Sequence, residues 1–146
     1  MGKRKKIIKN GTVVTASDTY SADLFIEGET ISRIGRDIQV PDAEIVDAAG
    51  MLILPGGIDP HTHFALSMFE TISSDDHYTG HKAAAFGGTT TVMDFVPQEG
   101  SDLKKNIRDW HAKADHKAAV DYGFHMNITL FNETVAGQIP GLLEEG

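Results

Sequence analysis

A change at Pro55-Gly56 in the pattern of predicted secondary structure constrains the fold of this chain more than any other feature of its sequence. Before it, short β-prone runs are separated by turn residues, and Asn10-Gly11 and Gly28-Glu29 each lie between two such runs. Asn-Gly favours a two-residue hairpin turn because both residues tolerate a positive φ. We therefore predict a small antiparallel sheet in residues 1–55, with a domain boundary at its end.

After Pro55 the pattern alternates between strand and helix, which is typical of βαβ units and a parallel sheet. Ser74 or Asp75 is expected to cap the first helix, and Gly87-Gly88 to end it. We predict that residues 56–146 form three βα units, so that the fold class of the chain is α/β. The expected strands are 57–63, 89–96 and 122–130, and the expected helices are 75–86, 102–114 and 133–145.

Composition excludes several classes of function. The 146 residues include 21 acidic and 13 basic side chains, a formal net charge of −8, so neither a nucleic acid nor an anionic membrane surface is an expected partner. No apolar run approaches the roughly 20 residues that span a bilayer. The basic residues 3–6 are not followed by the apolar segment of a signal peptide. The absence of cysteine excludes thiolate metal sites, and the expected compartment is the cytoplasm.

Two histidines carry the strongest chemical signal. His61 and His63 lie two residues apart in a predicted strand, so both rings project from one face of it, which they share with Asp59. They also fall at the carboxyl end of the first parallel strand, where α/β barrels place catalytic groups. Neutral imidazole is a good ligand for Zn²⁺ or Mn²⁺. Two histidines are an incomplete hydrolytic site, and on spacing alone a structural role is favoured over metal binding.

The surrounding sequence resembles a known family. The segment PGGIDPHTHF, preceded by VDAAGMLIL, is similar to the first barrel strand of metal-dependent amidohydrolases. Within that superfamily, DDHYTGHKAAAFGGTTTVMDFV and DYGFHMNIT resemble the segments that follow the histidines in hydantoinases and dihydropyrimidinases. The resemblance extends from Ile7 to Gly146.

This resemblance implies a β-sandwich domain beside a (β/α)₈ TIM-type barrel. Residues 1–55 would then be the N-terminal portion of an antiparallel β-sandwich, and residues 56–146 the first three βα units of an incomplete barrel. It implies two divalent metal ions, Zn²⁺ or alternatively Mn²⁺, bridged by hydroxide and a carbamylated lysine. The implied reaction is hydrolysis of the ring amide C–N bond of a hydantoin or dihydropyrimidine, in a homotetramer. Only His61 and His63 match family ligand positions.

The remaining site residues of the family have no counterpart here. The bridging lysine, the second ion's ligands and the general acid/base are expected beyond Gly146, so we assign no catalytic residue in this chain. We therefore expect the isolated 146-residue chain to have little or no hydrolase activity. The alternatives are a non-catalytic dihydropyrimidinase-related assembly protein, an allantoinase, and a self-sufficient α/β binding module.

The residues after the histidines bear on the substrate. Dihydroorotases commonly place an arginine two residues after the pair, whereas Phe64 and Ala65 follow it here, which favours a neutral ring. Leu66, Met68 and Phe69 fall where the family has its first stereochemistry-gating loop, and apolar side chains suit the exocyclic substituent of the substrate. Simple packing of the loop is an equally good explanation of these three residues.

The other histidines are predicted to take no part in the chemistry. His77 and His81 lie four apart on one helical face without the flanking glutamate of a metal-binding helix, so we expect them at the surface. His125 is expected to be a hydrogen-bonded core residue. His111 and His116 are expected to be solvated.

For both Asp94 and Trp110, a structural role is the preferred interpretation. Asp94, late in the second parallel strand, is expected to make a structural hydrogen bond, and orientation of a histidine ring is the alternative. Trp110 shares one face of the second helix with Leu103, Ile107 and Ala114, which predicts that it is buried.

Overall fold

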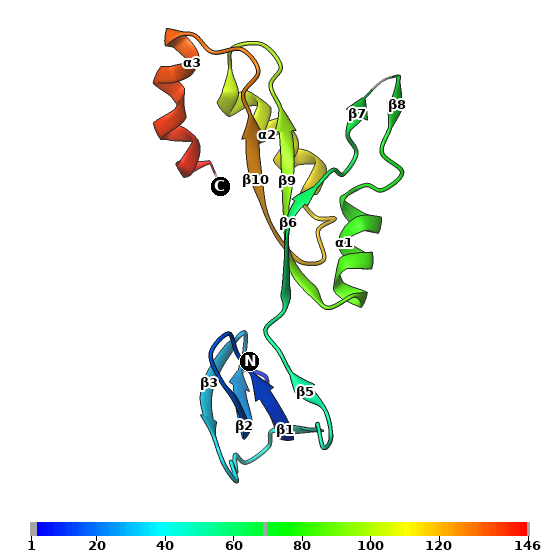
Figure 1. Ribbon diagram of the computed structural model, residues 1–146, viewed down its shortest axis with the longest axis vertical. Helices are drawn as coiled ribbons and strands as arrows, with labels where there is room; N and C mark the ends of the chain where they lie inside the picture. Colours follow the sequence, from blue (N-terminus) through cyan, green and yellow to red (C-terminus); the bar gives the residue numbers. More distant parts are fainter. Residues whose placement is uncertain (1–2, 69, 146) are drawn as a thin grey trace. The chain divides into compact units, whose positions relative to one another are not determined.

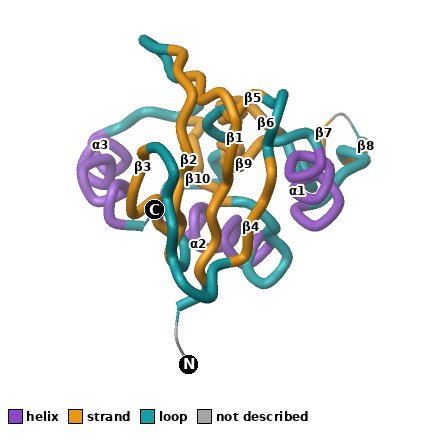
Figure 2. The backbone as a smooth tube through the Cα atoms, turned by 90° about the horizontal axis from the view of Figure 1, so that it is seen from below, coloured by secondary structure: helices purple, strands orange, loops and turns teal. Residues whose placement is uncertain are grey.

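The computed structural model describes residues 3–68 and 70–145. The chain divides into two compact units, residues 1–55 and 56–146, each of which is described by itself (Figure 1). The first unit is a sheet without helices among its described residues. The second unit alternates strands and helices, and this alternation can be followed in Figure 2.

The sheet of the first unit has five strands in the order β3-β2-β1-β4, with β5 also paired to β1. Neighbouring pairs among β1, β2 and β3 are antiparallel, whereas β4 and β5 run parallel to β1. Its buried core includes Val13, Ala22 and Leu24, which come from β1 and β2. The strands are β1 (Lys5–Val14), β2 (Thr19–Glu27), β3 (Thr30–Gly35), β4 (Glu44–Asp47) and β5 (Leu52–Ile53).

The hairpin predicted at Asn10-Gly11 is wrong, because β1 runs straight through these residues. The positive φ of Asn10, 63°, serves a β-bulge at which the register with β2 shifts. Two carboxylates hold this bulge: Asp23 Oδ1 accepts the Asn10 N–H at 3.2 Å, and Asp47 Oδ1 accepts Asn10 Nδ2–H at 2.9 Å. The turn predicted at Gly28-Glu29 does join β2 to β3, with φ 68° at Gly28.

The expectation of a purely antiparallel sheet is also wrong. Residues 36–43 return the chain to the end of the sheet at which β1 starts, so Glu44 pairs with Lys6 in the parallel sense. Ile38 anchors this connection because it is buried and its N–H donates to Asp23 Oδ2 at 3.0 Å. The first unit is therefore a mixed sheet.

The second unit contains a parallel three-stranded sheet in the order β10-β9-β6. A short antiparallel ribbon, β7-β8, precedes α1 and was not predicted from the sequence. The elements are β6 (Gly57–Thr62), β7 (Ser67–Met68), β8 (Thr71–Ile72), α1 (His77–Phe86), β9 (Thr89–Pro97), α2 (Leu103–Ala114), β10 (Asp121–Asn127), α3 (Glu133–Gln138) and the 3₁₀ helix η1 (Ile139–Glu144).

Helix α1 begins one to two residues later than predicted. Its cap is Asp76, whose Oδ1 accepts the N–H groups of Tyr78 and Thr79 at 2.9 Å, while the Asp76 N–H donates to Thr79 Oγ1. Asp75 is used elsewhere, since its carbonyl accepts the Ala65 N–H at 2.8 Å. The helix ends at Gly87, as predicted.

One face of strand β9 is buried beneath helices. Val92, Asp94 and Val96 alternate along β9 and are buried, and both α1 and α2 pack against this strand. Helix α2 is capped by Asp102 and buries its Leu103, Ile107, Trp110 and Ala114, so its predicted start and apolar face are confirmed. No helix among the described residues is long and apolar enough to cross a membrane.

Candidate metal site

The rings of His61 and His63 converge at the end of β6. Their Nε2 atoms are 3.2 Å apart and their ring centroids 5.1 Å apart, and both side chains are exposed. The extended backbone explains this arrangement, because side chains two residues apart in a strand project from the same face. The pair therefore presents two nitrogens to one point in solvent.

This donor set fits a divalent cation. Two nitrogens at about 2.0–2.1 Å from a tetrahedral Zn²⁺ are about 3.4 Å apart, close to the separation of the two Nε2 atoms. Imidazole nitrogen suits Zn²⁺ and Mn²⁺. Within residues 3–68 and 70–145, however, no group of three or more His, Cys, Asp or Glu side chains could hold a metal ion. The two histidines could therefore supply only part of a coordination sphere.

The main-chain ladder between β6 and β9 is irregular at this pair. Its register shifts between Asp59 and Thr62, a stretch that contains Pro60, which has no N–H to donate. Side chains replace the missing ladder bonds: Asp59 Oδ1 accepts the His61 N–H at 3.2 Å, and Thr62 Oγ1–H donates to the Met93 carbonyl at 3.1 Å. The direction of the two rings therefore depends on side-chain hydrogen bonds.

The ring of Phe95 on β9 packs against both histidine rings. Its ring centroid lies 4.4 Å from that of His61, 5.3 Å from that of His63 and 4.9 Å from that of His125. The prediction of a core position for His125 of β10 is wrong, because its side chain is exposed. Its partner in the strand register is Phe95 of β9. Its Nε2 does have a partner, the Pro60 carbonyl at 3.1 Å. No local pattern marks this neighbourhood, because it depends on the register of β10 on β9.

A pocket of about 200 Å³ lies next to His63. Leu66 in its lining is half-buried, and Met68 is 45% exposed. Phe69, the third residue predicted to contact the substrate, lies outside the described residues. The pocket is lined by His63, Leu66, Ser67, Met68, Phe95, Pro97 and Asn127.

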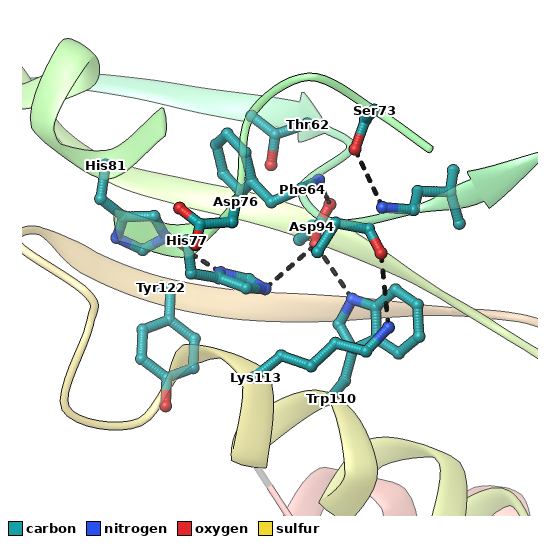
Figure 3. A network of polar contacts seen from close by, with 12 residues as sticks. Thr62, Phe64, Ser73, Asp76, His77, His81, Asp94, Trp110, Lys113 and Tyr122 are labelled. Atoms are coloured by element: carbon teal, nitrogen blue, oxygen red, sulfur yellow. Dashed lines mark hydrogen bonds and ion pairs between the residues drawn. The ribbon is translucent and has the colours of Figure 1, made fainter. Parts of the chain in front are cut away.

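The loop that follows His63 is anchored at successive residues. The Leu66 N–H donates to Ser73 Oγ at 2.9 Å, and Lys113 Nζ of α2 lies 3.5 Å from the Ala65 carbonyl (Figure 3). Ala65 itself has φ 47°, a conformation that costs energy for a residue with a Cβ. These bonds hold the start of the loop against α2 and the approach to α1.

Behind the sheet, a buried polar network joins α1, α2 and β9 (Figure 3). Asp94 is 1% exposed, and its Oδ2 accepts the Trp110 Nε1–H at 3.0 Å while its Oδ1 accepts the Phe64 N–H at 3.2 Å. His77 Nε2 lies 3.6 Å from the same Oδ2, and His77 Nδ1 lies 3.3 Å from His81 Nε2. The predicted structural hydrogen bond of Asp94 is therefore present, and the predicted burial of Trp110 is confirmed.

The surface position predicted for His77 and His81 is wrong, because both are fully buried. The helix packs this face on β9, and Gly80 lets the Phe64 ring approach between the two histidines. Burial lowers the pKa of His77, although Asp94 opposes the shift, and burial likewise lowers the pKa of His81. Both rings are held in the neutral form near pH 7.

The flank of this network on α2 and β10 is also partly buried. Lys113 Nζ lies 3.3 Å from the Trp110 ring centroid, and burial lowers the pKa of this lysine. Burial and a hydrogen bond to Asp115 raise the pKa of Tyr122 to about 12. His111 is not solvated as predicted, since its Nδ1 lies 3.2 Å from the Tyr122 hydroxyl. The expectation for His116 holds, because its side chain is exposed.

Comparison with curated proteins finds hydantoinases. The chain is 49% identical over 141 residues to the D-hydantoinase of Geobacillus stearothermophilus, covering 96% of this chain and 30% of that protein. It is 43% identical over 145 residues to the D-phenylhydantoinase of Escherichia coli, covering 96% of this chain and 31% of that protein. No protein-family model matches the chain. The chain thus spans about 30% of the length of these relatives.

Solved structures give the same result. A crystal structure of D-hydantoinase aligns with a TM-score of 0.93 at 49% identity over 97% of this chain and 31% of the other. The dihydropyrimidinase of Brevibacillus agri aligns with a TM-score of 0.93 at 51% identity, over 95% of this chain and 30% of the other. These likenesses place the chain among the amidohydrolases. Within that superfamily it belongs to the hydantoinase family.

Proposed function

We propose that this chain is the N-terminal portion of a divalent-metal-dependent cyclic amidohydrolase of the D-hydantoinase or dihydropyrimidinase type. The reaction proposed for the whole protein is hydrolysis of the ring amide C–N bond of hydantoins or dihydropyrimidines. The observation that carries this proposal is the convergence of His61 Nε2 and His63 Nε2 to 3.2 Å, in a chain whose relatives bear these enzyme names.

His61 and His63 would together hold one of two divalent ions, Zn²⁺ or Mn²⁺. Such ions supply Lewis-acid activation of an amide carbonyl. The described residues offer no complete ligand set, so we assign the bridging carbamylated lysine, the other ligands and the general acid/base to polypeptide outside these 146 residues. The contribution of this chain is to present two imidazoles in a fixed direction against Phe95.

Leu66 and Met68 would contact the exocyclic substituent of the substrate. Their pocket beside His63 is completed by Phe95, and its described lining includes no lysine or arginine, which supports a neutral ring as the ligand. Its volume of about 200 Å³ is below the usual range for ligand sites, about 300–1,000 Å³, as expected if other segments complete it. Phe69 keeps the same proposed role from its sequence position.

The proposed architecture is part of a β-sandwich and the first three βα units of a TIM-type barrel. An apolar groove of about 290 Å³ on the first sheet, lined in part by Ile31 and Ile34, supports a second sheet layer there. Parallel β6, β9 and β10 with helices packed on β9 support the barrel units. A cytoplasmic homotetramer is proposed for the whole protein.

The test uses the full-length polypeptide that the gene encodes. Ring opening of hydantoin and dihydrouracil is followed by chromatography of the N-carbamoyl product, with allantoin as a third substrate. We expect turnover of the first two, loss with a chelator, recovery with Zn²⁺ or Mn²⁺, and loss in His63→Asn. No turnover with either metal would refute the proposal and favour an assembly protein, and turnover of allantoin alone would favour an allantoinase.

A second arm assays the mass-verified 146-residue chain by itself. We expect no measurable ring opening, because two imidazoles do not complete a hydrolytic site. Chelator-sensitive turnover by this chain would overturn that expectation.

A further inference from the structure

The carboxylate of Asp94 joins three elements around the end of β6. It is 1% exposed and accepts hydrogen bonds from the Trp110 indole of α2 and from the Phe64 main chain, while His77 of α1 lies 3.6 Å away. A buried carboxylate is costly unless hydrogen bonds compensate for the lost water. Each oxygen of Asp94 has one N–H donor, Oδ1 from Phe64 and Oδ2 from Trp110.

The bond from the Phe64 N–H lies just beyond the last residue of β6 that pairs with β9. The pairing of Thr62 with Asp94 is the last between β6 and β9, and it follows the register shift after Asp59. The Phe64 N–H belongs to the peptide group that directly follows His63. Its bond to Asp94 Oδ1 sets the plane of that peptide, and with it the direction in which the His63 ring leaves the chain.

We infer that Asp94 is a positioning residue for the His61/His63 pair: from the helix-covered side of β9, its carboxylate fixes the peptide after His63 and so holds the two Nε2 atoms together. This inference rests on the proposed function. It assigns to Asp94 no contact with metal or substrate.

The role requires a carboxylate. Both groups that bond to Asp94 are N–H donors, from Phe64 and Trp110, and an ionised carboxylate accepts at both oxygens. An asparagine has the same shape but one acceptor, so its NH₂ would face one of the two donors. Replacing Trp110 by phenylalanine removes the indole donor, which leaves the asparagine oxygen free to accept the Phe64 N–H.

The experiment compares four variants of the full chain: Asp94→Asn, Trp110→Phe, the double variant, and Val92→Ala as a matched control. Val92 is buried on the same face of β9, two residues before Asp94, and has no polar role. Binding of Zn²⁺ is read from the ring ¹⁵N resonances of His61 and His63, and stability from urea denaturation. An NOE between the two rings reports their proximity without metal.

We expect Asp94→Asn to weaken Zn²⁺ binding roughly 10- to 100-fold, the range typical of residues that orient metal ligands. Trp110→Phe and Val92→Ala should lower stability and leave Zn²⁺ binding at the wild-type level. The double variant should be less stable than Asp94→Asn and yet recover Zn²⁺ binding. From Asp94→Asn to the double variant, stability would fall while Zn²⁺ affinity rises. A merely structural role of Asp94 would lower both quantities together.

Several results would overturn the inference. Wild-type affinity in Asp94→Asn would do so, as would affinity that falls with stability across all four variants. If Asp94→Asn does not fold, reduced affinity in Trp110→Phe would count against it. If the wild-type chain binds no Zn²⁺ at His61 and His63, the proposed metal ligation fails, and the inter-ring NOE decides alone: it must disappear in Asp94→Asn and persist in Val92→Ala.

Discussion

Two histidine pairs in this chain have nearly the same separation and opposite surroundings. The nearest nitrogens are 3.2 Å apart in His61/His63 and 3.3 Å apart in His77/His81. The first pair stands exposed at the end of a strand, two residues apart. The second lies fully buried between a helix and the sheet, four residues apart.

The difference shows that spacing brings two imidazoles together but does not decide what they do. Solvent access leaves His61 and His63 able to take a cation, with Phe95 as their support. Burial lowers the pKa values of His77 and His81. The two rings contact each other and the rings of Phe64 and Tyr122. We therefore propose metal binding for the first pair and packing for the second.

The largest expected effect separates the pairs by metal affinity. His63→Ala should lower the affinity for Zn²⁺ by roughly 100-fold or more, because a single imidazole cannot chelate. His81→Leu should leave the affinity unchanged. Isothermal titration of both variants checks this expectation. A loss of affinity confined to His81→Leu would reverse the assignment of the two pairs.

The next effect concerns packing at the buried pair. A Cβ at Gly80 would lie 2.1 Å from Phe64 Cε1, so Gly80→Ala should lower the free energy of unfolding by about 1–3 kcal/mol through overpacking. Gly137→Ala is the matched control, since a Cβ there meets no atom of the described residues within 4 Å. That variant should be neutral or stabilising by up to about 1 kcal/mol, as usual in helices. Urea denaturation that ranks the two variants in the opposite order would contradict this packing.

A third prediction uses pH. Because burial lowers the pKa values of His77 and His81 below 6.5 in the folded chain, the unfolded chain binds more protons just below that pH. The free energy of unfolding should therefore fall as the pH drops below about 6.5 and continue to fall through the lower, folded pKa values. Denaturation curves across this range, compared with His77→Phe/His81→Leu, measure the effect. An equally steep fall in the double variant would exclude these histidines as its source.

The smallest effect is expected at the exposed pair without metal. His61→Asn and His63→Asn should each change the free energy of unfolding by no more than about 0.5 kcal/mol, as is usual for surface positions. The same denaturation experiment, with chelator present, provides the measurement. A loss of several kcal/mol would mean that these rings are structural.

Much of the secondary structure could be predicted from local pattern. The start of α2 at Asp102 and the apolar face of this helix each carry their own signal, and the structure confirms them. The error at Asn10-Gly11 arose because a positive φ suits a bulge as well as a turn. Which one forms is decided by Asp23 and Asp47, which are distant in sequence.

The candidate site could be predicted only in part, for the same reason. The two-residue spacing of His61 and His63 places their rings on one side of β6, and their nitrogens do meet. The burial of His77 and His81 depends on which face of α1 packs on β9, and that face has little apolar character to mark it. The position of Asp94 behind the His63 peptide is set by the register of β6 on β9, which no local pattern encodes.

The most direct test of this account is anomalous X-ray diffraction at the zinc absorption edge from crystals of the protein grown with Zn²⁺. The account predicts a peak about 2.0–2.1 Å from both His61 Nε2 and His63 Nε2. A peak between His77 and His81, or well-ordered rings of His61 and His63 with no zinc between them, would contradict it.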